Sequence, residues 1–129
     1  MATYFFDACI SPKLVAMLVA LGTDHQVLHM FSEGFDRDMK DVDLIPAVAK
    51  RGNLFVTCDN AQRRKLVEKV LREQVKISTV FLWGGFSSLM KWPQARWIIN
   101  HWEQISKETC HFAAGDTFLV KQSGKVEKL

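Results

Sequence analysis

The sequence is poor in the features that define several protein classes. Only three of its 129 residues are cysteine, and their odd number and wide spacing fit neither a disulfide framework nor a zinc site. No apolar run approaches the roughly 18 residues that a membrane helix requires, and the first residues lack the charged and apolar regions of a signal peptide. We therefore expect a cytoplasmic protein without membrane contact, in which Cys9, Cys58 and Cys110 are small buried apolar residues.

The sequence does contain enough apolar residues, 48% of the total, for one hydrophobic core. A chain of this length corresponds to one ordinary domain, predicted to span residues 1–129. Its charge is uneven: residues 1–61 carry five Lys or Arg against eight Asp or Glu, and residues 62–129 carry twelve against six. This asymmetry suits a cation site beside a surface for a polyanion, and equally two solvated surfaces of different sign.

Two segments that read as buried strands each lead into an aspartate. Tyr4–Asp7 and Leu54–Asp59 are rich in β-branched and aromatic residues. Because the carboxyl ends of neighbouring parallel strands gather at one edge of an open α/β sheet, where ligands bind, we expect both aspartates to face one pocket. Two carboxylates placed close together are unfavourable unless a cation or a shared proton compensates them.

Helix and strand patterns alternate along the rest of the chain. Ser11 and Pro12 begin a helix whose apolar stripe ends at Gly22, and the next strand follows. A strand, a helix and a strand in this order predict a parallel sheet with a right-handed crossover. The later elements expected are a polar loop over 31–40, a helix over 42–51, a strand over 54–57, a helix after residue 60, a strand over 78–83, a helix from residue 93 and a hairpin over 117–127.

The helix over 42–51 brings a third acidic residue to the predicted pocket. Asp41 lies three and four positions before Leu44 and Ile45, so its side chain belongs with the buried face of this helix. Asp43 falls on the side turned toward solvent. An aspartate here also suits a helix N-cap, which is the alternative explanation for Asp41.

Asp7, Asp41 and Asp59 together indicate a site for Mg²⁺ or Mn²⁺, which prefer oxygen ligands. Such an ion polarises a phosphodiester and lowers the pKa of an attacking water. Thr57 and Asn60 flank Asp59 and are expected to orient a water or a carboxylate, as neutral polar neighbours of metal ligands do.

The predicted helix after residue 60 is strongly basic. Its cations are Arg63, Arg64, Lys65, Lys69, Arg72 and Lys76, and its apolar stripe is Leu66, Val67, Val70 and Leu71. Arg63, Arg64 and Lys65 lie within two turns of Asp59, so we expect them to bind substrate phosphates. A solvated helix face is the competing interpretation. The four tryptophans between residues 83 and 102 are assigned to core packing or a dimer contact before base stacking.

The order and spacing of these motifs resemble the PIN-like domain family, in particular its VapC-type toxin relatives. The resemblance covers nearly the whole chain and rests on Phe5-Phe6-Asp7, Ser11-Pro12, Asp41, Gly52, Val56-Thr57-Cys58-Asp59, Phe81-Leu82 and the segment Trp92–Ile105. It implies a three-layer α/β/α fold around a mainly parallel sheet. It also implies a Mg²⁺- or Mn²⁺-dependent ribonuclease, often a homodimer and commonly the toxin of a toxin–antitoxin pair, with RNA and a cognate antitoxin protein as partners.

Carried over by position, the family's acidic metal-binding residues correspond to Asp7, Asp41 and Asp59. Relatives often place a further acid two residues beyond the last of these, where this sequence has Ala61. That departure favours an alternative, a catalytically impaired PIN-like domain that binds RNA or a protein. A phosphatase of the haloacid dehalogenase type would need Asp-x-Asp after the first strand, where this chain has Asp7-Ala8-Cys9. A receiver domain would need a neighbouring acidic pair there and a lysine at a later strand end, so both readings are disfavoured.

Overall fold

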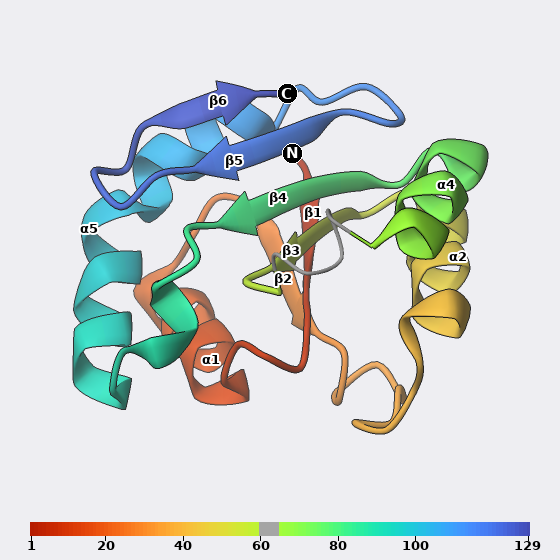
Figure 1. The fold of residues 1–129 in the computed structure, drawn as a ribbon. Helices are drawn as coiled ribbons and strands as arrows, with labels where there is room; N and C mark the ends of the chain where they lie inside the picture. Colours follow the sequence, from red (N-terminus) through yellow and green to blue (C-terminus); the bar gives the residue numbers. More distant parts are fainter. Residues whose placement is uncertain (60–64) are drawn as a thin grey trace.

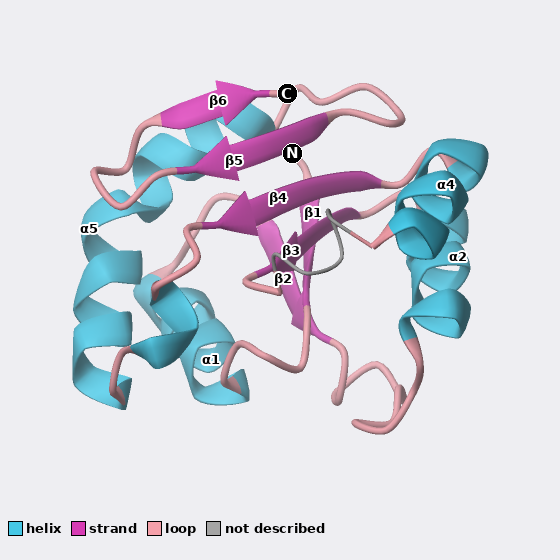
Figure 2. Ribbon diagram, in the orientation of Figure 1, coloured by secondary structure: helices cyan, strands magenta, loops and turns pink. Residues whose placement is uncertain are grey.

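The computed structural model describes residues 1–59 and 65–129 and shows an α/β protein of three layers (Figures 1 and 2). Its strands are β1 (Thr3–Phe6), β2 (Gln26–His29), β3 (Leu54–Thr57), β4 (Ser78–Leu82), β5 (Thr117–Val120) and β6 (Val126–Lys128). They form one sheet in the order β2-β1-β3-β4-β5-β6, in which β1 to β5 are parallel and β6 is antiparallel. The predicted mainly parallel sheet with a C-terminal hairpin is confirmed.

Helices cover both faces of this sheet. They are α1 (Pro12–Leu21), α2 (Asp41–Arg51), α4 (Leu66–Val75) and α5 (Lys91–Thr109), with a short 3₁₀ helix η1 (Phe86–Ser88) between β4 and α5. Figure 1 shows α1 and α5 on one side of the sheet and α2 and α4 on the other. Within residues 1–59 and 65–129, no helix is long and apolar enough to cross a membrane.

The ends of α1 follow from local chemistry. The Ser11 hydroxyl oxygen accepts a hydrogen bond from the Lys13 backbone N–H, and Pro12 occupies the first helical position, where its missing N–H is not needed. The helix ends at Gly22, whose φ of 79° lies in the left-handed region that favours glycine. The Ser11 cap and Pro12 fix where α1 begins, and they therefore also fix the path of the turn between β1 and α1.

Alternation along β1 divides the core into two layers. Tyr4 and Phe6 point toward α1 and α5, whereas Phe5 points toward α2 and α4. Every residue of β3 and β4 is buried, as expected for central parallel strands with helices on both faces. Trp97 and Trp102 from α5 belong to the first layer and Trp83 packs against it, as core packing of the tryptophans predicts, whereas Trp92 is exposed.

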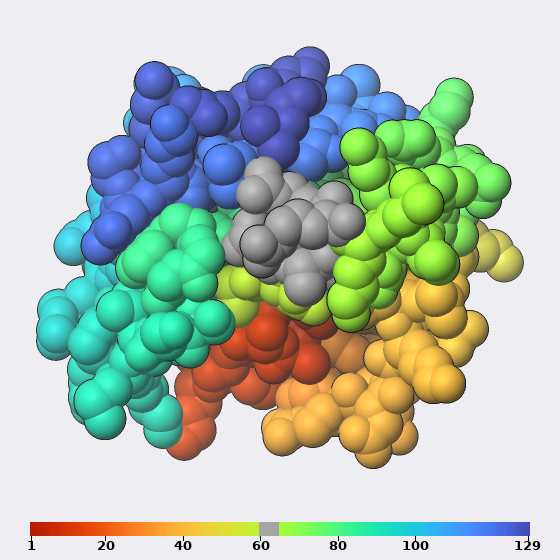
Figure 3. All heavy atoms as spheres, viewed as in Figure 1, coloured from red at the N-terminus to blue at the C-terminus, as the bar shows by residue number. Residues whose placement is uncertain are grey.

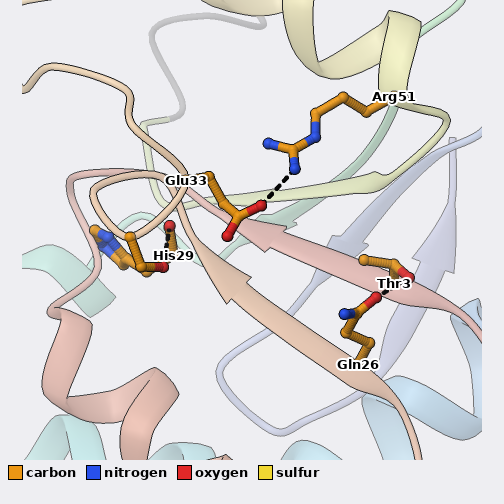
Figure 4. A network of polar contacts seen from close by, with 6 residues as sticks. Thr3, Gln26, His29, Glu33 and Arg51 are labelled. Carbon is orange, nitrogen blue, oxygen red and sulfur yellow. Dashed lines mark hydrogen bonds and ion pairs between the residues drawn. The ribbon is translucent and has the colours of Figure 1, made fainter.

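An ion pair and two ring contacts hold α2 against the sheet. Arg51 in its last turn pairs with Glu33 in the loop after β2 (Figure 4). The Arg51 guanidinium carbon also lies 5.2 Å from the ring centroid of Phe5 and 5.8 Å from that of Phe35. Cation–π contacts of this kind stabilise by about 0.5–1 kcal/mol at exposed sites. They fix the orientation of the helix whose first residue is Asp41.

The apolar stripe predicted for α4 is wrong in most of its members. Leu66, Val67 and Val70 have exposed fractions of 73%, 67% and 42%, and only Leu71 packs against the core. The buried side chain of this helix is Arg72, whose guanidinium carbon lies 4.7 Å from the ring centroid of Phe81. A long arginine stem fills apolar space as a hydrophobic residue would, so α4 turns a basic residue toward the sheet. The last two apolar residues of the stripe predicted for α1, Val19 and Leu21, are also exposed.

Tyr4 connects the sheet to α5. Its hydroxyl shares a hydrogen bond of 2.8 Å with the Thr109 hydroxyl and donates to the Ser106 carbonyl oxygen at 3.3 Å. Its ring packs edge-on against Trp102, with 4.9 Å between the ring centroids. Burial disfavours the phenolate and raises the pKa of Tyr4 to about 12.

We expect ionisation of Tyr4 to destabilise the fold in alkali. Its folded-state pKa lies above the ordinary tyrosine value of 10.0, so its contribution is complete below that pH and is lost as the pH rises through about 12. The loss amounts to roughly 3 kcal/mol, and Tyr4→Phe should remove this component. Because Tyr4 is the single tyrosine, ultraviolet titration of tyrosinate reports on it directly. A titration midpoint of the folded protein at the ordinary tyrosine pKa would contradict the burial argument.

We expect Arg72→Met to stabilise the protein by roughly 1 kcal/mol in urea denaturation, since it removes a buried charge and keeps the stem. Among the described residues, neither terminal guanidinium nitrogen of Arg72 has a hydrogen-bond partner, and burial lowers its pKa to about 10. Arg96→Met, at an exposed position of α5, is the matched control and should change stability by less than about 0.5 kcal/mol. A large loss in Arg72→Met would show that the guanidinium stabilises the fold.

Candidate active site

The site lies where β1 and β3 end side by side. These strands pair in parallel with Phe6 opposite Val56, and the Asp7 N–H extends the ladder by donating to the Val56 carbonyl oxygen at 2.9 Å. The chain leaves β1 toward β2 on one side and later returns as β3 on the other, so this edge is the switch point of the sheet order. Ligands of open α/β sheets bind at such a point. Asp7 and Asp59 both follow these strand ends.

A cavity of about 390 Å³ opens at this edge. Its lining includes all three predicted acids, Asp7, Asp41 and Asp59, together with Ala8, Cys9, Met30, Arg37, Met39, Leu44, Cys58 and Ser87. Figure 3 shows that the red start of the chain, the orange loop before α2 and the light green start of α4 meet on one face of the molecule. The fold therefore brings three acids from distant parts of the sequence to one hollow.

Asp7 is the most buried of the three acids, with an exposed fraction of 7%. One carboxylate oxygen accepts the Ala8 N–H at 2.7 Å, and the other accepts the Thr57 hydroxyl at 2.8 Å. The same Thr57 oxygen accepts the Asp59 N–H at 3.0 Å. Thr57, itself fully buried, thus joins the first acid to the backbone of the third and positions both.

The carboxyl groups of Asp7 and Asp41 are shifted toward the neutral form. Burial is the main cause that raises the pKa of Asp7, and it outweighs the hydrogen bonds from Thr57 and Ala8, with a further contribution from the charge of Asp59. Burial likewise raises the pKa of Asp41, followed by repulsion from Asp7 and Asp59. Burial and mutual repulsion thus disfavour the charged forms of Asp7 and Asp41, and a cation beside them would offset this effect.

The two aspartates at the start of α2 differ as the helical spacing predicts. Asp41 is half-buried and lines the cavity, while Asp43 is exposed and does not. The N-cap of α2 is Lys40, which makes no side-chain capping bond, so Asp41 is the first helical residue and not the cap. A carboxylate in the first turn also interacts favourably with the positive end of the helix dipole.

The structure describes only some of the residues predicted to bind substrate. Asn60, Arg63 and Arg64 fall outside residues 1–59 and 65–129 and stay predictions. Lys65 is exposed immediately before α4, where its ammonium lies 3.9 Å from the Glu68 carboxylate. The sequence interpretation missed Arg37, an exposed cation that lines the cavity from the long loop before α2. The length of that loop was the available signal.

The prediction that all three cysteines are buried is wrong for Cys9, which is exposed, whereas Cys58 is buried and Cys110 is half-buried. Cys9 lies on the turn after β1, at the mouth of the cavity. Its sulfur accepts the Cys58 N–H at 3.3 Å and lies 3.7 Å from a carboxylate oxygen of Asp7. A hydrogen bond from the Cys58 thiol lowers the pKa of Cys9, and the same bond raises that of Cys58.

Asp7, Asp41 and Asp59 supply carboxylate oxygens, which are the ligands that a hard divalent cation prefers. Mg²⁺ keeps several waters and uses one or two carboxylates together with substrate phosphates. Repulsion from neighbouring acids contributes to the raised pKa values of Asp7 and Asp41, so a cation in the cavity would relieve it. Within residues 1–59 and 65–129, however, no group of three His, Cys, Asp or Glu is placed so that it could hold a metal ion. The chemistry of the three carboxyl groups therefore suits a cation, whereas their placement does not form a three-ligand site.

A family model described as a PIN like domain matches residues 2–83. The matched range runs from β1 to the end of β4 and contains Asp7, Asp41 and Asp59. The last helix and the C-terminal hairpin lie beyond it. No curated protein and no solved structure matches the chain.

We expect Asp7→Asn to stabilise the protein in metal-free buffer near neutral pH. Burial raises the pKa of Asp7, so the neutral form is favoured in the folded state and wild-type stability falls as the pH rises above the ordinary aspartate value of 3.8. The melting temperature of the variant should be higher by about 2–5 °C. Below the ordinary aspartate pKa, Asp7 is protonated, and the difference should vanish.

Asp43→Asn, at the exposed position, is the matched control and should leave the melting temperature unchanged. A lower melting temperature for Asp7→Asn at neutral pH would show that the hydrogen bonds from Thr57 and Ala8 outweigh burial.

Proposed function

The chain belongs to the PIN-like domain family, and from this we propose that it is a metal-dependent endoribonuclease. PIN-like domains are commonly nucleases, which are hydrolases of phosphodiester bonds. The observation that carries the proposal is the convergence of Asp7, Asp41 and Asp59 on one cavity at the switch point of the sheet. Carboxylates that converge with raised pKa values on a cavity are candidates for catalytic roles.

Asp7, Asp41 and Asp59 would hold Mg²⁺ or Mn²⁺, which when bound lowers the pKa of an attacking water and stabilises charge on the phosphate. The chain's own groups prepare this site. Thr57 and the Ala8 N–H hold the Asp7 carboxylate in one orientation. Depth in the protein keeps bulk water from Asp7, which strengthens its interaction with any cation.

Cations at the rim would bind the RNA backbone. Arg37 lines the cavity, and its guanidinium carbon lies 5.2 Å from the ring centroid of Phe31, which restrains the side chain. Lys65 stands at the start of α4, and Arg63 and Arg64 precede it in the sequence. Arginine binds phosphate oxygens in a bidentate manner, so we assign phosphate contacts to Arg37 as well as to the three residues selected from the sequence.

The resemblance to VapC-type toxins supports a narrower form of this proposal. In this form the protein is the toxin of a toxin–antitoxin pair, acts on RNA in the cytoplasm, and is inhibited by a cognate antitoxin protein. A homodimer belongs to the same proposal.

A binding module without activity is the second candidate. Two observations favour it: Ala61 stands where relatives often have an acid, and the described residues contain no three-ligand group that encloses a metal ion. In this case the protein would have the fold and the carboxylate cavity of a nuclease, while its basic residues near α4 would bind RNA without cleaving it.

Cleavage of a labelled single-stranded RNA with Mg²⁺ or Mn²⁺ separates the two candidates. For the enzyme we expect cleavage that EDTA abolishes and that Asp7→Ala and Asp59→Asn each reduce by about 100-fold or more, since carboxylates that contact a metal matter at least as much as their neighbours. Asp43→Asn should cleave at the wild-type rate, because Asp43 is exposed and outside the cavity. RNA binding without cleavage at any metal concentration would establish the binding module, and undiminished cleavage by both variants would exclude this cavity as the active centre.

A further inference from the structure

Cys9 and Cys58 contact each other at the mouth of the carboxylate cavity. The Cys9 sulfur accepts the backbone N–H of Cys58 at 3.3 Å, and the Cys58 thiol donates to the carbonyl oxygen of Cys9 at 3.7 Å. Each sulfur therefore contacts the backbone of the other residue.

The pairing of β1 with β3 creates this contact. Phe6 is the register partner of Val56, and the two cysteines follow these residues by three and two positions at the same edge of the sheet. A disulfide requires Cα atoms within about 7 Å and Cβ atoms that face each other. The contacts of each sulfur with the other residue's backbone, at 3.3 Å and 3.7 Å, bring the two side chains into the neighbourhood that such a bond requires.

The two thiols differ in access. Cys9 is exposed and reachable from solvent, whereas Cys58 has an exposed fraction of 4%. An oxidant in solution therefore meets Cys9 first, and Cys58 lies behind it as the second thiol. An accessible thiol backed by a buried neighbour is the arrangement in which a mixed disulfide is resolved within the protein.

We propose that Cys9 and Cys58 form a reversible intramolecular disulfide at the mouth of the carboxylate cavity, with a low-molecular-weight disulfide such as oxidised glutathione as the oxidant. The Cys9 thiolate attacks one sulfur of the oxidant, whose S–S bond breaks and releases one thiol. Cys58 then loses its proton and attacks the Cys9 sulfur, which releases the second thiol. The two cysteines together lose two electrons and two protons, and the oxidant gains them.

The new bond would alter the surroundings of Asp7. The Cys9 sulfur lies 3.7 Å from an Asp7 carboxylate oxygen and 3.5 Å from the Thr57 hydroxyl. Bonding to Cys58 removes the thiol proton that Cys9 directs at Asp7 and ties together the turns that carry Asp7 and Asp59. The disulfide requires no nuclease activity, so its existence is independent of the proposed function.

Mass spectrometry of the full chain tests the proposal in a Cys110→Ser background, which removes the third thiol. After incubation with oxidised glutathione we expect the mass to fall by two hydrogens and the peptides of Cys9 and Cys58 to be linked. Dithiothreitol should reverse both changes. Stable glutathione on Cys9 without linkage, or no reaction at all, would overturn the proposal.

Two matched variants test the order of attack. Cys58→Ser should accumulate one glutathione per chain, because the mixed disulfide on Cys9 has no second thiol to resolve it. Cys9→Ser should react at least about tenfold more slowly than the parent, because the remaining thiol is buried. Equal rates for the two variants would contradict the assignment of Cys9 as the attacking thiol.

Discussion

The hydrogen bond between Asp7 and Thr57 is the interaction on which the site depends. It crosses from the end of β1 to the end of β3, and the same threonine oxygen accepts the Asp59 N–H. One hydroxyl therefore sets the relative position of two acids that are far apart in the sequence. The bond is not strong enough to offset the burial of the Asp7 carboxylate, whose pKa stays raised. Asp7 is thus held where binding of a cation is favourable, and the fold is less stable when no cation is bound.

Local signals in the sequence were sufficient for most of the fold. The buried strand at Tyr4–Phe6, the Ser11-Pro12 helix start and the helix end at Gly22 depend on neighbouring residues alone, and the structure confirms each of them. The strand–helix–strand rule then supplied a parallel sheet. The acids at strand ends followed from this architecture, because parallel strands deliver their last residues to one edge.

The rest depended on how elements pack, which a sequence pattern does not contain. Helical spacing alone allows α4 to turn either Leu66 and Val67 or Arg72 toward the sheet. The stacking of Arg72 over Phe81 decides that Arg72 is the buried residue. Cys9 was assigned to the core by residue type, although its turn lies at the mouth of a cavity. Arg37 belongs to a loop whose path no periodicity encodes.

The order of strands has a consequence for how the protein is made. β1 pairs with β2 and β3, and its contact with β3 joins Phe5 to Phe55, a long separation in sequence. Closing such a loop precedes any gain from pairing, so non-local parallel sheets fold slowly. During synthesis the chain has no second acidic strand end until Asp59 has left the ribosome. The cavity can therefore form only after β3 has been synthesised, although Asp7 and Asp41 precede that strand in the chain.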